Sequence, residues 1–443
     1  MDKQDSPKIK DTIIQLLSNL ANPKEIQKYL DRFTQAGQSH FAVVKVGGAV
    51  LEKDMDNLCS SLAFLERIGL FPILVHGAGP QLSANLKAKD IETQFIEGQR
   101  VTSAPVLTNA KQTFVAQNMT LATTLQGIGV KTSSITTGVF QAKPVENDQL
   151  GYVGEVTGVN LEPIELAIRS GAIPILSPLA DSETGQTLNI NADVATNQLA
   201  IALKPYKIIF LTETGGILDD NGEIISAVNL ATDFDDLMQQ DWLHSGMKLK
   251  VKQVNDILQQ LPDSASVSIT NPMHLSKELF THKGSGTLIR KGERIQAFPK
   301  GDGADTDTLT RLIEASFKKT LADDYFDTVP VNTIYATQCY RAAAIIRDFD
   351  DIPYLDKFVV ANEAKGEGLG KTLWNHIRSQ HKSMFWRCTP DNPINGFYFS
   401  HADGCYKTEQ WNFFWFGIND FNTIAKCFDF VLEQKITLKE LTT

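Results

Sequence analysis

The feature of this chain that most restricts its fold is a long alternation of short apolar runs with amphipathic helical stretches. The alternation extends from Phe41 to Ile289. Short apolar runs separated by helices are typical of a parallel sheet that is buried on both faces. We therefore predict an α/β fold in which helices cover both sides of the sheet. The predicted strands are Phe41–Val46, Phe71–Val75, Ile173–Leu176, Ile208–Thr212 and Ala265–Thr270.

The pattern changes after residue 289, which predicts a second domain. Residues 290–306 are rich in charge and glycine and contain a proline, so we predict a linker there. The segments that follow read as an antiparallel meander and then a helix from about Gly370 to Ser379. We predict a helical arm over 1–35, an α/β domain over 36–289 and an α+β domain over 307–443. The meander strands are predicted at Val331–Thr337, Tyr340–Arg347 and Tyr354–Ala361.

Composition excludes several classes of protein. A net charge of −10 over 443 residues disfavours a nucleic-acid-binding chain. The five cysteines are scattered without C-x-x-C spacing, so neither a disulfide framework nor a zinc site is expected, and no metal-ligating residues are predicted. No apolar run is long enough to span a bilayer, and the N-terminus lacks the features of a targeting peptide. We expect a cytoplasmic protein that binds neither nucleic acid nor membrane.

Two glycine turns follow the first two predicted strands. Gly47 and Gly48 come after Lys45, and Gly77, Ala78 and Gly79 come after the next strand. In a parallel sheet these turns meet at the carboxyl edge, where ligands usually bind. Their amides can surround a phosphate, and Lys45 can neutralise its charge during phosphoryl transfer. Each turn alone is weak evidence, because most glycine turns bind no ligand.

Further residues strengthen this hypothesis. Arg100, the run from Asn189 to Asp193, and Lys250 complete a pattern that resembles the amino-acid kinase family over residues 38–289, and within it the N-acetyl-L-glutamate kinases. The resemblance implies an αβα sandwich. It also implies that Lys45 and Lys250 clamp the transition state, that Asp193 orients both lysines, and that Arg100 and Asn189 hold N-acetylglutamate.

The same resemblance places Glu213 near ATP, which would arrive with Mg²⁺. Two positions depart from the family pattern. Ala78 stands where a glycine is usual, and Glu213 stands where an aspartate is common. Neither change removes a charge, so we expect an active kinase.

A third glycine-rich segment lies far downstream, around Lys365, Gly366, Gly368, Gly370 and Lys371. Its end looks like a P-loop, but a P-loop requires glycine at position 365, where a lysine stands. A basic residue, two spacers and two glycines at the entry of a helix suit a pyrophosphate instead. The alternative is a glycine-rich helix entry without a ligand.

The C-terminal domain resembles the GCN5-related acetyltransferase family, in which such a segment grips coenzyme A. The resemblance implies that acetyl-CoA is bound by this segment and by the strand that contains Phe358, Val359 and Val360. Residues 354–358 and 386–399 resemble the vertebrate-like type of N-acetylglutamate synthase domain. That resemblance implies that glutamate is held by three side chains and that a phenol acts as general acid. The residues are Lys357, Arg387 and Asn392 for glutamate and Tyr398 for the proton.

The order of the domains resembles bifunctional N-acetylglutamate synthase/kinases of arginine biosynthesis. The resemblance implies acetylation of L-glutamate, phosphorylation of N-acetyl-L-glutamate by ATP, and a homotetramer. The segment 278–287 resembles the end of arginine-sensitive kinases, which implies that Glu278 and Gly284 bind L-arginine as an inhibitor. Two alternatives stay open: a synthase whose kinase-like domain is an arginine-binding scaffold, and a non-catalytic arginine sensor.

Overall fold

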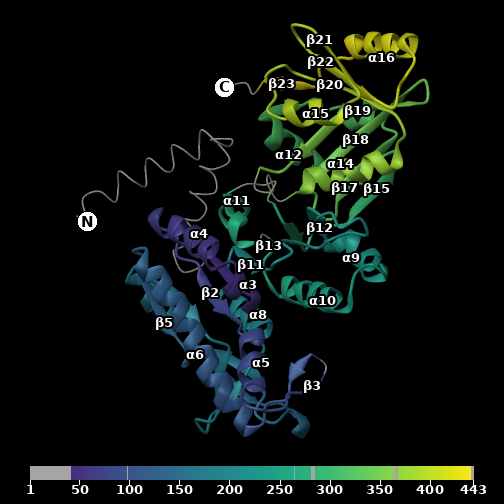
Figure 1. The fold of residues 1–443 in the computed structure, drawn as a ribbon. Helices are drawn as coiled ribbons and strands as arrows, with labels where there is room; N and C mark the ends of the chain where they lie inside the picture. The colour runs from purple at the N-terminus through teal and green to yellow at the C-terminus, as the bar shows by residue number, and fades with distance from the viewer. Residues whose placement is uncertain are drawn as a thin grey trace. The chain divides into compact units, whose positions relative to one another are not determined.

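The computed structural model describes residues 41–96, 98–263, 265–280, 285–362, 364 and 368–440. The predicted arm over residues 1–35 and the predicted site residues Gly284, Lys365 and Gly366 lie outside these ranges. The chain divides into two compact units, Met1–Lys291 and Gly292–Thr443 (Figure 1). Among the described residues, no helix combines the length and the apolar character that crossing a membrane requires.

The first unit is built on an eight-stranded sheet in the order β12-β14-β13-β11-β1-β2-β8-β5. Every neighbouring pair is parallel except β13 with β14. All five predicted strands are confirmed. The strands in sheet order are Ala227–Asn229, Thr287–Arg290, Ser266–Thr270, Lys207–Leu211, Ala42–Val46, Ile73–His76, Ile173–Leu176 and Thr132–Ile135.

Helices cover both faces of this sheet because its strands place apolar side chains on both faces. In β11, Ile209 and Leu211 pack in one core cluster with α4 and α6. Their neighbours Ile208 and Phe210 pack in another cluster, with α10 on the opposite face (Figure 1). The predicted αβα sandwich is confirmed. The helices of this unit are α3 Gly48–Lys53, α4 Met55–Arg67, α5 Gly79–Lys87, α6 Ala104–Gly127, α7 Glu162–Arg169, α8 Ala192–Leu203, α9 Leu230–Gln239, α10 Ser245–Gln260 and α11 Leu275–Phe280.

Smaller elements complete the first unit. A four-stranded sheet has the order β10-β9-β6-β7, and β3 and β4 form a short hairpin that contains Arg100. Their bounds are β10 Thr187–Asn189, β9 Leu179–Asp181, β6 Phe140–Pro144, β7 Gly154–Val159, β3 Phe95–Ile96 and β4 Gln99–Arg100; the 3-10 turns are η2 Asp148–Leu150 and η3 Pro272–His274.

The second unit contains a seven-stranded sheet in the order β15-β17-β18-β19-β20-β22-β21. The predicted meander corresponds to β17, β18 and β19, which pair antiparallel. The predicted helix is α14, and its fully buried Trp374 lies in the main core. The elements are β15 Ile295–Pro299, β17 Thr333–Thr337, β18 Ala342–Phe349, β19 Ile352–Val360, β20 Met384–Cys388, β21 Gly404–Lys407, β22 Asn412–Phe416, the pair β16 Lys319–Leu321 and β23 Leu438–Glu440, and helices α12 Thr306–Phe317, α13 Tyr325–Thr328, α14 Leu369–Gln380, α15 Asn395–His401 and α16 Phe421–Glu433.

The segment 290–306 differs from the predicted linker. It contains β15, which pairs with β17 from Ile295 opposite Thr337 to Pro299 opposite Thr333. Ile295 and Phe298 pack against the core of the second unit. These two apolar residues, spaced three apart among charges and glycines, are enough to anchor an edge strand. The boundary between the units therefore falls at Lys291, and the second unit begins before residue 307.

Strands β19 and β20 are parallel neighbours that pair over a short length. Their register includes Tyr354 opposite Phe385 and Leu355 opposite Trp386, and no further pair. Beyond Leu355 the backbone of β19 pairs with β18 but not with β20 among the described residues. Unpaired strand backbone presents donors and acceptors, so this place in the sheet can accept a polar ligand.

Candidate functional sites in the two units

The two predicted glycine turns face each other at the carboxyl edge of the first sheet. Gly47 and Ala78 are the N-caps of α3 and α5, which follow the adjacent strands β1 and β2. The amide of Gly77 donates to the carbonyl of Val46 over 2.8 Å. A Cβ on Gly48 would stand only 3.1 Å from the Cα of Ala78, so the close approach of the turns requires glycine there. The two helix N-termini that begin at Gly48 and Gly79 thus lie together, an arrangement that stabilises an anion.

Lys45, Asp193 and Lys250 form a charged group in the first unit. The Nζ of Lys45 lies 2.9 Å from Oδ1 of Asp193. Burial raises the pKa of Asp193, but the positive charges of Lys45 and Lys250 and a hydrogen bond from Lys45 outweigh it and hold this pKa below its usual value. Burial also lowers the pKa of Lys250, against the opposing effect of Asp193. One carboxylate thus pairs with Lys45 and interacts electrostatically with Lys250, which leaves an excess of positive charge.

The position of Asp193 is fixed by the start of α8. Asn191 is the N-cap, and its Oδ1 accepts the amide of Asp193 over 2.7 Å. Asn caps a helix because its side chain replaces the missing carbonyl of the preceding turn. This cap places the carboxylate in the first turn of α8, where negative charge is also favoured by the helix dipole. Asn191 was only part of a sequence run in the prediction, and its capping role emerges from the geometry.

Arg100 is buried and incompletely paired. Its Nη2 donates to Ser83 Oγ over 2.7 Å and to the carbonyl of Gly79 over 3.4 Å. Its Nη1 is buried and has no hydrogen-bond partner among the described residues. Burial lowers the pKa of this guanidinium. A buried donor without a partner is costly, so Arg100 is well suited to an anionic ligand beside the second glycine turn.

Asn189 is connected to Arg100 through Thr102. Its Nδ2 donates to Thr102 Oγ1 over 3.1 Å, and that hydroxyl donates to the carbonyl of Arg100 over 2.9 Å. Glu213 follows β11 and pairs with Lys53 at 3.0 Å, and both side chains are largely exposed. The structure therefore brings Arg100 and Asn189 together, and it places Glu213 beside α3.

Glu278 is almost completely buried, with 1% of its surface exposed. Its Oε1 accepts from Ser268 Oγ over 2.8 Å, and its Oε2 accepts from the amide of Ser285 over 3.1 Å. The buried ammonium of Lys207 donates to its main-chain carbonyl over 2.6 Å. The carboxylate thus accepts hydrogen bonds from two neutral donors, and its charge partly offsets the lowering by burial of the pKa of the nearby Lys207.

In the second unit, the start of α14 meets the part of β19 that pairs with β18 but not with β20. Gly368 is the N-cap of α14 and has a positive φ of 85°, which favours glycine. A Cβ on Gly370 would lie 3.2 Å from Cγ2 of Val360, so helix and strand approach closely here. Phe358, Val359 and Val360 supply the strand backbone, and Lys371 is exposed on the first turn of α14. These features fit a ligand that bridges the helix entry and the strand.

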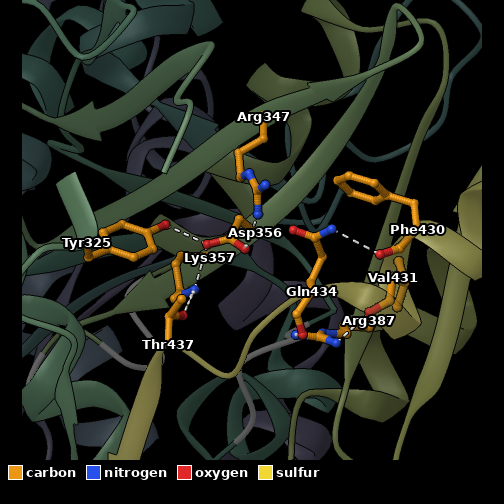
Figure 2. A network of polar contacts seen from close by, with 9 residues as sticks. All are labelled: Tyr325, Arg347, Asp356, Lys357, Arg387, Phe430, Val431, Gln434 and Thr437. Carbon is orange, nitrogen blue, oxygen red and sulfur yellow. Dashed lines mark hydrogen bonds and ion pairs between the residues drawn. The ribbon is translucent and has the colours of Figure 1, made fainter. Parts of the chain in front are cut away.

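Lys357 belongs to a network of charged side chains (Figure 2). Its Nζ donates to Asp356 Oδ2 over 2.6 Å and to Thr437 Oγ1 over 2.9 Å. Oδ2 of Asp356 also accepts the hydroxyl of Tyr325 over 2.5 Å, and Arg347 lies 3.6 Å from Oδ1. Asp356, Tyr325 and Arg347 were not predicted as site residues. The signal available in the sequence was an aspartate beside a lysine inside an apolar strand.

Arg387 lies on the next strand and contacts the end of α16. Its Nη1 donates to the carbonyl of Val431 over 2.6 Å, and its Nη2 donates to the carbonyl of Gln434 over 3.3 Å (Figure 2). The guanidinium also stacks over the ring of Trp411 at 4.1 Å. The network thus contains three cations, Arg347, Lys357 and Arg387, against one carboxylate.

Tyr398 lies on the other face of β20. Trp386 and Cys388 pack with it in the main core, whereas Arg387 between them reaches toward α16. Burial raises the pKa of Tyr398, so the phenol stays protonated at neutral pH. Its hydroxyl makes no hydrogen bond to any residue that the structure describes. Asn392 belongs to the turn before α15, where its Oδ1 accepts the amide of Ile394 over 3.2 Å. The predicted glutamate residues are thus not brought into one contact group: Lys357 and Arg387 share the network, and Asn392 does not.

Comparisons with known proteins match both units. Residues 40–271 match the amino acid kinase family, and residues 290–434 match the N-acetyltransferase of N-acetylglutamate synthase. An acetylglutamate kinase of Xanthomonas campestris pv. campestris is 49% identical over 413 residues, which cover 92% of this chain and 97% of that protein. The mitochondrial N-acetylglutamate synthase of Homo sapiens is 34% identical over 412 residues, which cover 90% of this chain and 74% of that protein.

A solved structure with the same fold is the N-acetylglutamate synthase from Neisseria gonorrhoeae complexed with coenzyme A and N-acetyl-glutamate. Its TM-score is 0.64 at 19% identity, and the match covers 90% of this chain and 98% of that chain. At this identity the likeness concerns the fold alone, whereas the sequence relatives extend over both units. The chain therefore belongs to the amino acid kinase family, in a group of arginine-biosynthesis enzymes in which a kinase domain is followed by an N-acetyltransferase domain.

Proposed function

We propose that this protein is a bifunctional enzyme of the vertebrate-like type that acetylates L-glutamate and then phosphorylates N-acetyl-L-glutamate. The observation that carries the proposal is that each unit gathers cations in excess around one buried carboxylate. These are Lys45 and Lys250 around Asp193, and Lys357 and Arg347 around Asp356. Both of the reactions bind anions, and neither half has lost the charges that it needs.

The kinase step uses the edge of the first sheet. A phosphoryl group in transfer spreads negative charge over its oxygens, so catalysis needs positioned donors and cations. Helix N-termini at Gly48 and Gly79 supply the donors, and Lys45 and Lys250 supply the charge. Asp193 orients both lysines. ATP would bring Mg²⁺ with its phosphates, because this ion is usually bound through substrate phosphates and one or two carboxylates.

N-Acetylglutamate is held by Arg100 and Asn189. The unpaired Nη1 of Arg100 is available for a carboxylate, and charge-assisted bonds of this kind are stronger than neutral ones. Asn189 offers its amide on the same hydrogen-bonded chain. Glu213, which follows β11, contributes to the binding of ATP.

The acetyltransferase step takes place where β19 and β20 no longer pair, beyond Leu355. The backbone of Phe358–Val360 and the entry of α14 bind acetyl-CoA, with Lys365, Gly366, Gly368, Gly370 and Lys371 at the pyrophosphate. Lys357, Arg387 and Asn392 bind glutamate, whose two carboxylates offset the two excess positive charges of the network. When the thioester breaks, the leaving thiolate needs a proton, and the neutral phenol of Tyr398 gives it.

Arg387 and Tyr398 lie on opposite faces of β20. Because the two strands do not pair beyond Leu355, we infer that substrate bound at Arg387 reaches the thioester between them. The split therefore explains how residues on two faces serve one reaction.

Regulation and assembly complete the proposal. L-Arginine inhibits through Glu278 and Gly284, the protein works in the cytoplasm, and it forms a homotetramer. The buried carboxylate of Glu278 accepts hydrogen bonds from Ser268 and Ser285, and a guanidinium would give it charge-assisted bonds, which supports an arginine ligand.

The deciding experiment measures two reactions on the same preparation. Formation of ADP with N-acetylglutamate and formation of N-acetylglutamate from acetyl-CoA and glutamate should both proceed. Acetylation without ADP formation would favour the alternative, a synthase with a kinase-like regulatory scaffold. Neither activity, with arginine binding intact, would identify a sensor.

A further inference from the structure

The carboxylate of Asp356 stands inside a site that is proposed to bind carboxylates, which calls for a physical reason. Arg347 lies on β18, Asp356 and Lys357 on β19, and Arg387 on β20, so these side chains come from three consecutive strands. An acidic side chain at this place repels an anionic substrate. Its presence is understandable if it acts on a neighbouring residue and not on the substrate.

A β-bulge determines how Asp356 and Lys357 meet. Ile346 pairs with Leu355 and Ile345 pairs with Lys357, so Asp356 is the extra residue on β19. Consecutive side chains of a regular strand point to opposite faces. The bulge changes this direction, and the Nζ of Lys357 reaches Oδ2 of its own neighbour at 2.6 Å.

The ammonium of Lys357 is held from two sides and keeps one donor. A lysine ammonium has three N–H groups. Asp356 Oδ2 and Thr437 Oγ1 accept two of them, and the described part of the chain offers no third acceptor. The centroid of the Tyr325 ring also lies 4.8 Å from Nζ of Lys357. The third N–H thus has no oxygen or nitrogen acceptor among the described residues.

Tyr325 fixes the carboxylate in turn. Its hydroxyl, on α13, donates to the same oxygen of Asp356 that accepts from Lys357, at 2.5 Å (Figure 2). Tyr325 is 1% exposed, so this bond is shielded from water. Charge-assisted hydrogen bonds of this kind are about twice as strong as neutral ones. The chain Tyr325–Asp356–Lys357 thus runs from a buried helix to the ammonium.

We propose that Asp356 and Tyr325 are positioning residues of the acetyl-acceptor site, which hold the ammonium of Lys357 so that its free N–H meets a carboxylate of a dicarboxylic amino acid. The inference rests on the proposed acetylation of glutamate. Neither residue touches the substrate. Asp356 also keeps Lys357 charged, and Tyr325 keeps Asp356 in place.

The charges around Lys357 support this assignment. Burial lowers the pKa of Lys357, and the like charges of Arg387 on β20 and Arg347 on β18 lower it further. Only the carboxylate of Asp356 acts in the opposite direction. Tyr325 on α13 and Thr437 before β23 are neutral partners. Without Asp356, Lys357 loses its proton more readily. The substrate carboxylate then lacks one positively charged partner.

The test uses Tyr325→Phe, Asp356→Asn and the control Tyr335→Phe in the full-length enzyme. Tyr335 has a hydroxyl that bonds to His381 at 3.0 Å, on β17 and outside the network. Initial rates of acetylation are measured against glutamate and against acetyl-CoA from about pH 6.5 to about pH 9.5, a range that approaches the usual lysine pKa. Thermal unfolding and calorimetric binding of coenzyme A report whether each variant is folded.

Tyr325→Phe is expected to raise the KM for glutamate about three- to tenfold at every pH, the effect of one lost hydrogen bond. The KM for acetyl-CoA should stay within about twofold of the parent. In Asp356→Asn, the alkaline rise of the KM for glutamate should begin at least about one pH unit lower than in the parent. Tyr335→Phe should match the parent. A purely structural role of Asp356 would change the rates without moving this pH dependence.

The outcomes separate the two hypotheses. If the parent acetylates glutamate but neither variant changes its KM or the pH dependence, the positioning role is wrong and the proposed function stands. If the KM values for both substrates rise equally, the residues support the whole fold and the positioning role is again wrong. A folded parent that binds coenzyme A but does not acetylate glutamate would refute the proposed function and this inference with it.

Discussion

The ammonium of Lys45 on β1 and the carboxylate of Asp193 on α8 form an ion pair of 2.9 Å. The two residues are far apart in sequence, and both side chains are mostly buried, with 14% and 23% of their surfaces exposed. Lys250 on α10 acts on the same carboxylate. Side chains from β1, α8 and α10 thus place two positive charges near one carboxylate, which is what the proposed phosphoryl transfer would need.

Lys45→Met should lower the rate of ADP formation on the order of 10²–10³-fold, because one preorganised cation at the transition state is lost. Acetylation of glutamate, in the other unit, should be unchanged. Lys143→Met is a matched control, since Lys143 is 52% exposed on β6 and pairs with two exposed glutamates, Glu146 and Glu155. An equal loss of both activities in Lys45→Met would indicate a structural lysine.

Gly48→Ala should impair the kinase through packing alone. The new Cβ would lie 2.9 Å from Pro80 Cδ and 3.1 Å from Ala78 Cα, so the two turns must separate. Because misplacement of about 1 Å can cost about 10² in rate, ADP formation should fall by a similar factor. Gly127→Ala, at the end of α6 with no atom within 4 Å, should behave as the parent. Normal ADP formation in Gly48→Ala would show that the turns do not depend on this contact.

The sequence predicted the sheet of the first unit well because its strands are short apolar runs between helices. The family resemblance pointed to Lys45, Asp193 and Lys250; the structure pairs Lys45 with Asp193, Lys250 acts on the same carboxylate, and their catalytic roles stay a prediction. The linker prediction was wrong because β15 is an edge strand anchored by two partly buried apolar residues, which is too weak a pattern to outweigh its charges.

The network around Lys357 could not be predicted in the same way. It depends on a bulge at Asp356, and the bulge is specified by the pairing of β18 with β19. A single strand shows only its alternation, which would put Asp356 and Lys357 on opposite faces. Tyr325 and Thr437 come from distant segments that no local pattern connects.

His76 should make the protein less stable in mild acid. It is fully buried beside Ser177, and burial lowers its pKa to about 4. The unfolded chain takes up a proton near pH 6.5, and the folded protein does so only near pH 4. The stability that His76 contributes is therefore complete above about pH 6.5 and falls by about 3 kcal/mol as the pH drops to about 4.

Urea unfolding of the parent and of His76→Gln would measure this effect. Between about pH 7 and about pH 4.5, the free energy of unfolding should fall by about 2 kcal/mol more in the parent than in the variant. Parallel curves for the two proteins would mean that His76 is protonated in the folded state.

Tyr398→Phe should lower the turnover of acetylation by roughly 10²–10⁴, the contribution of a general acid. Binding of acetyl-CoA should change little, because the ring remains packed between Trp374 and Trp386. Tyr406→Phe, which removes a hydroxyl from a tyrosine that is 57% exposed, is the control. Turnover of Tyr398→Phe within about threefold of the parent would assign the proton to another group.

Glu278→Gln should weaken inhibition by L-arginine more than about tenfold, because a charged partner of the guanidinium becomes neutral. The amide keeps one acceptor for Ser268 or Ser285, so the fold should persist. Inhibition also requires that arginine bind one arrangement of the protein better than another, since equal binding to both shifts nothing.

Both activities would be titrated with arginine in the parent, in Glu278→Gln and in the exposed control Glu183→Gln. Unchanged inhibition in Glu278→Gln would exclude this carboxylate as the effector site. A parent that arginine does not inhibit would exclude the regulation itself, while the kinase and acetyltransferase proposals would remain open to their own tests.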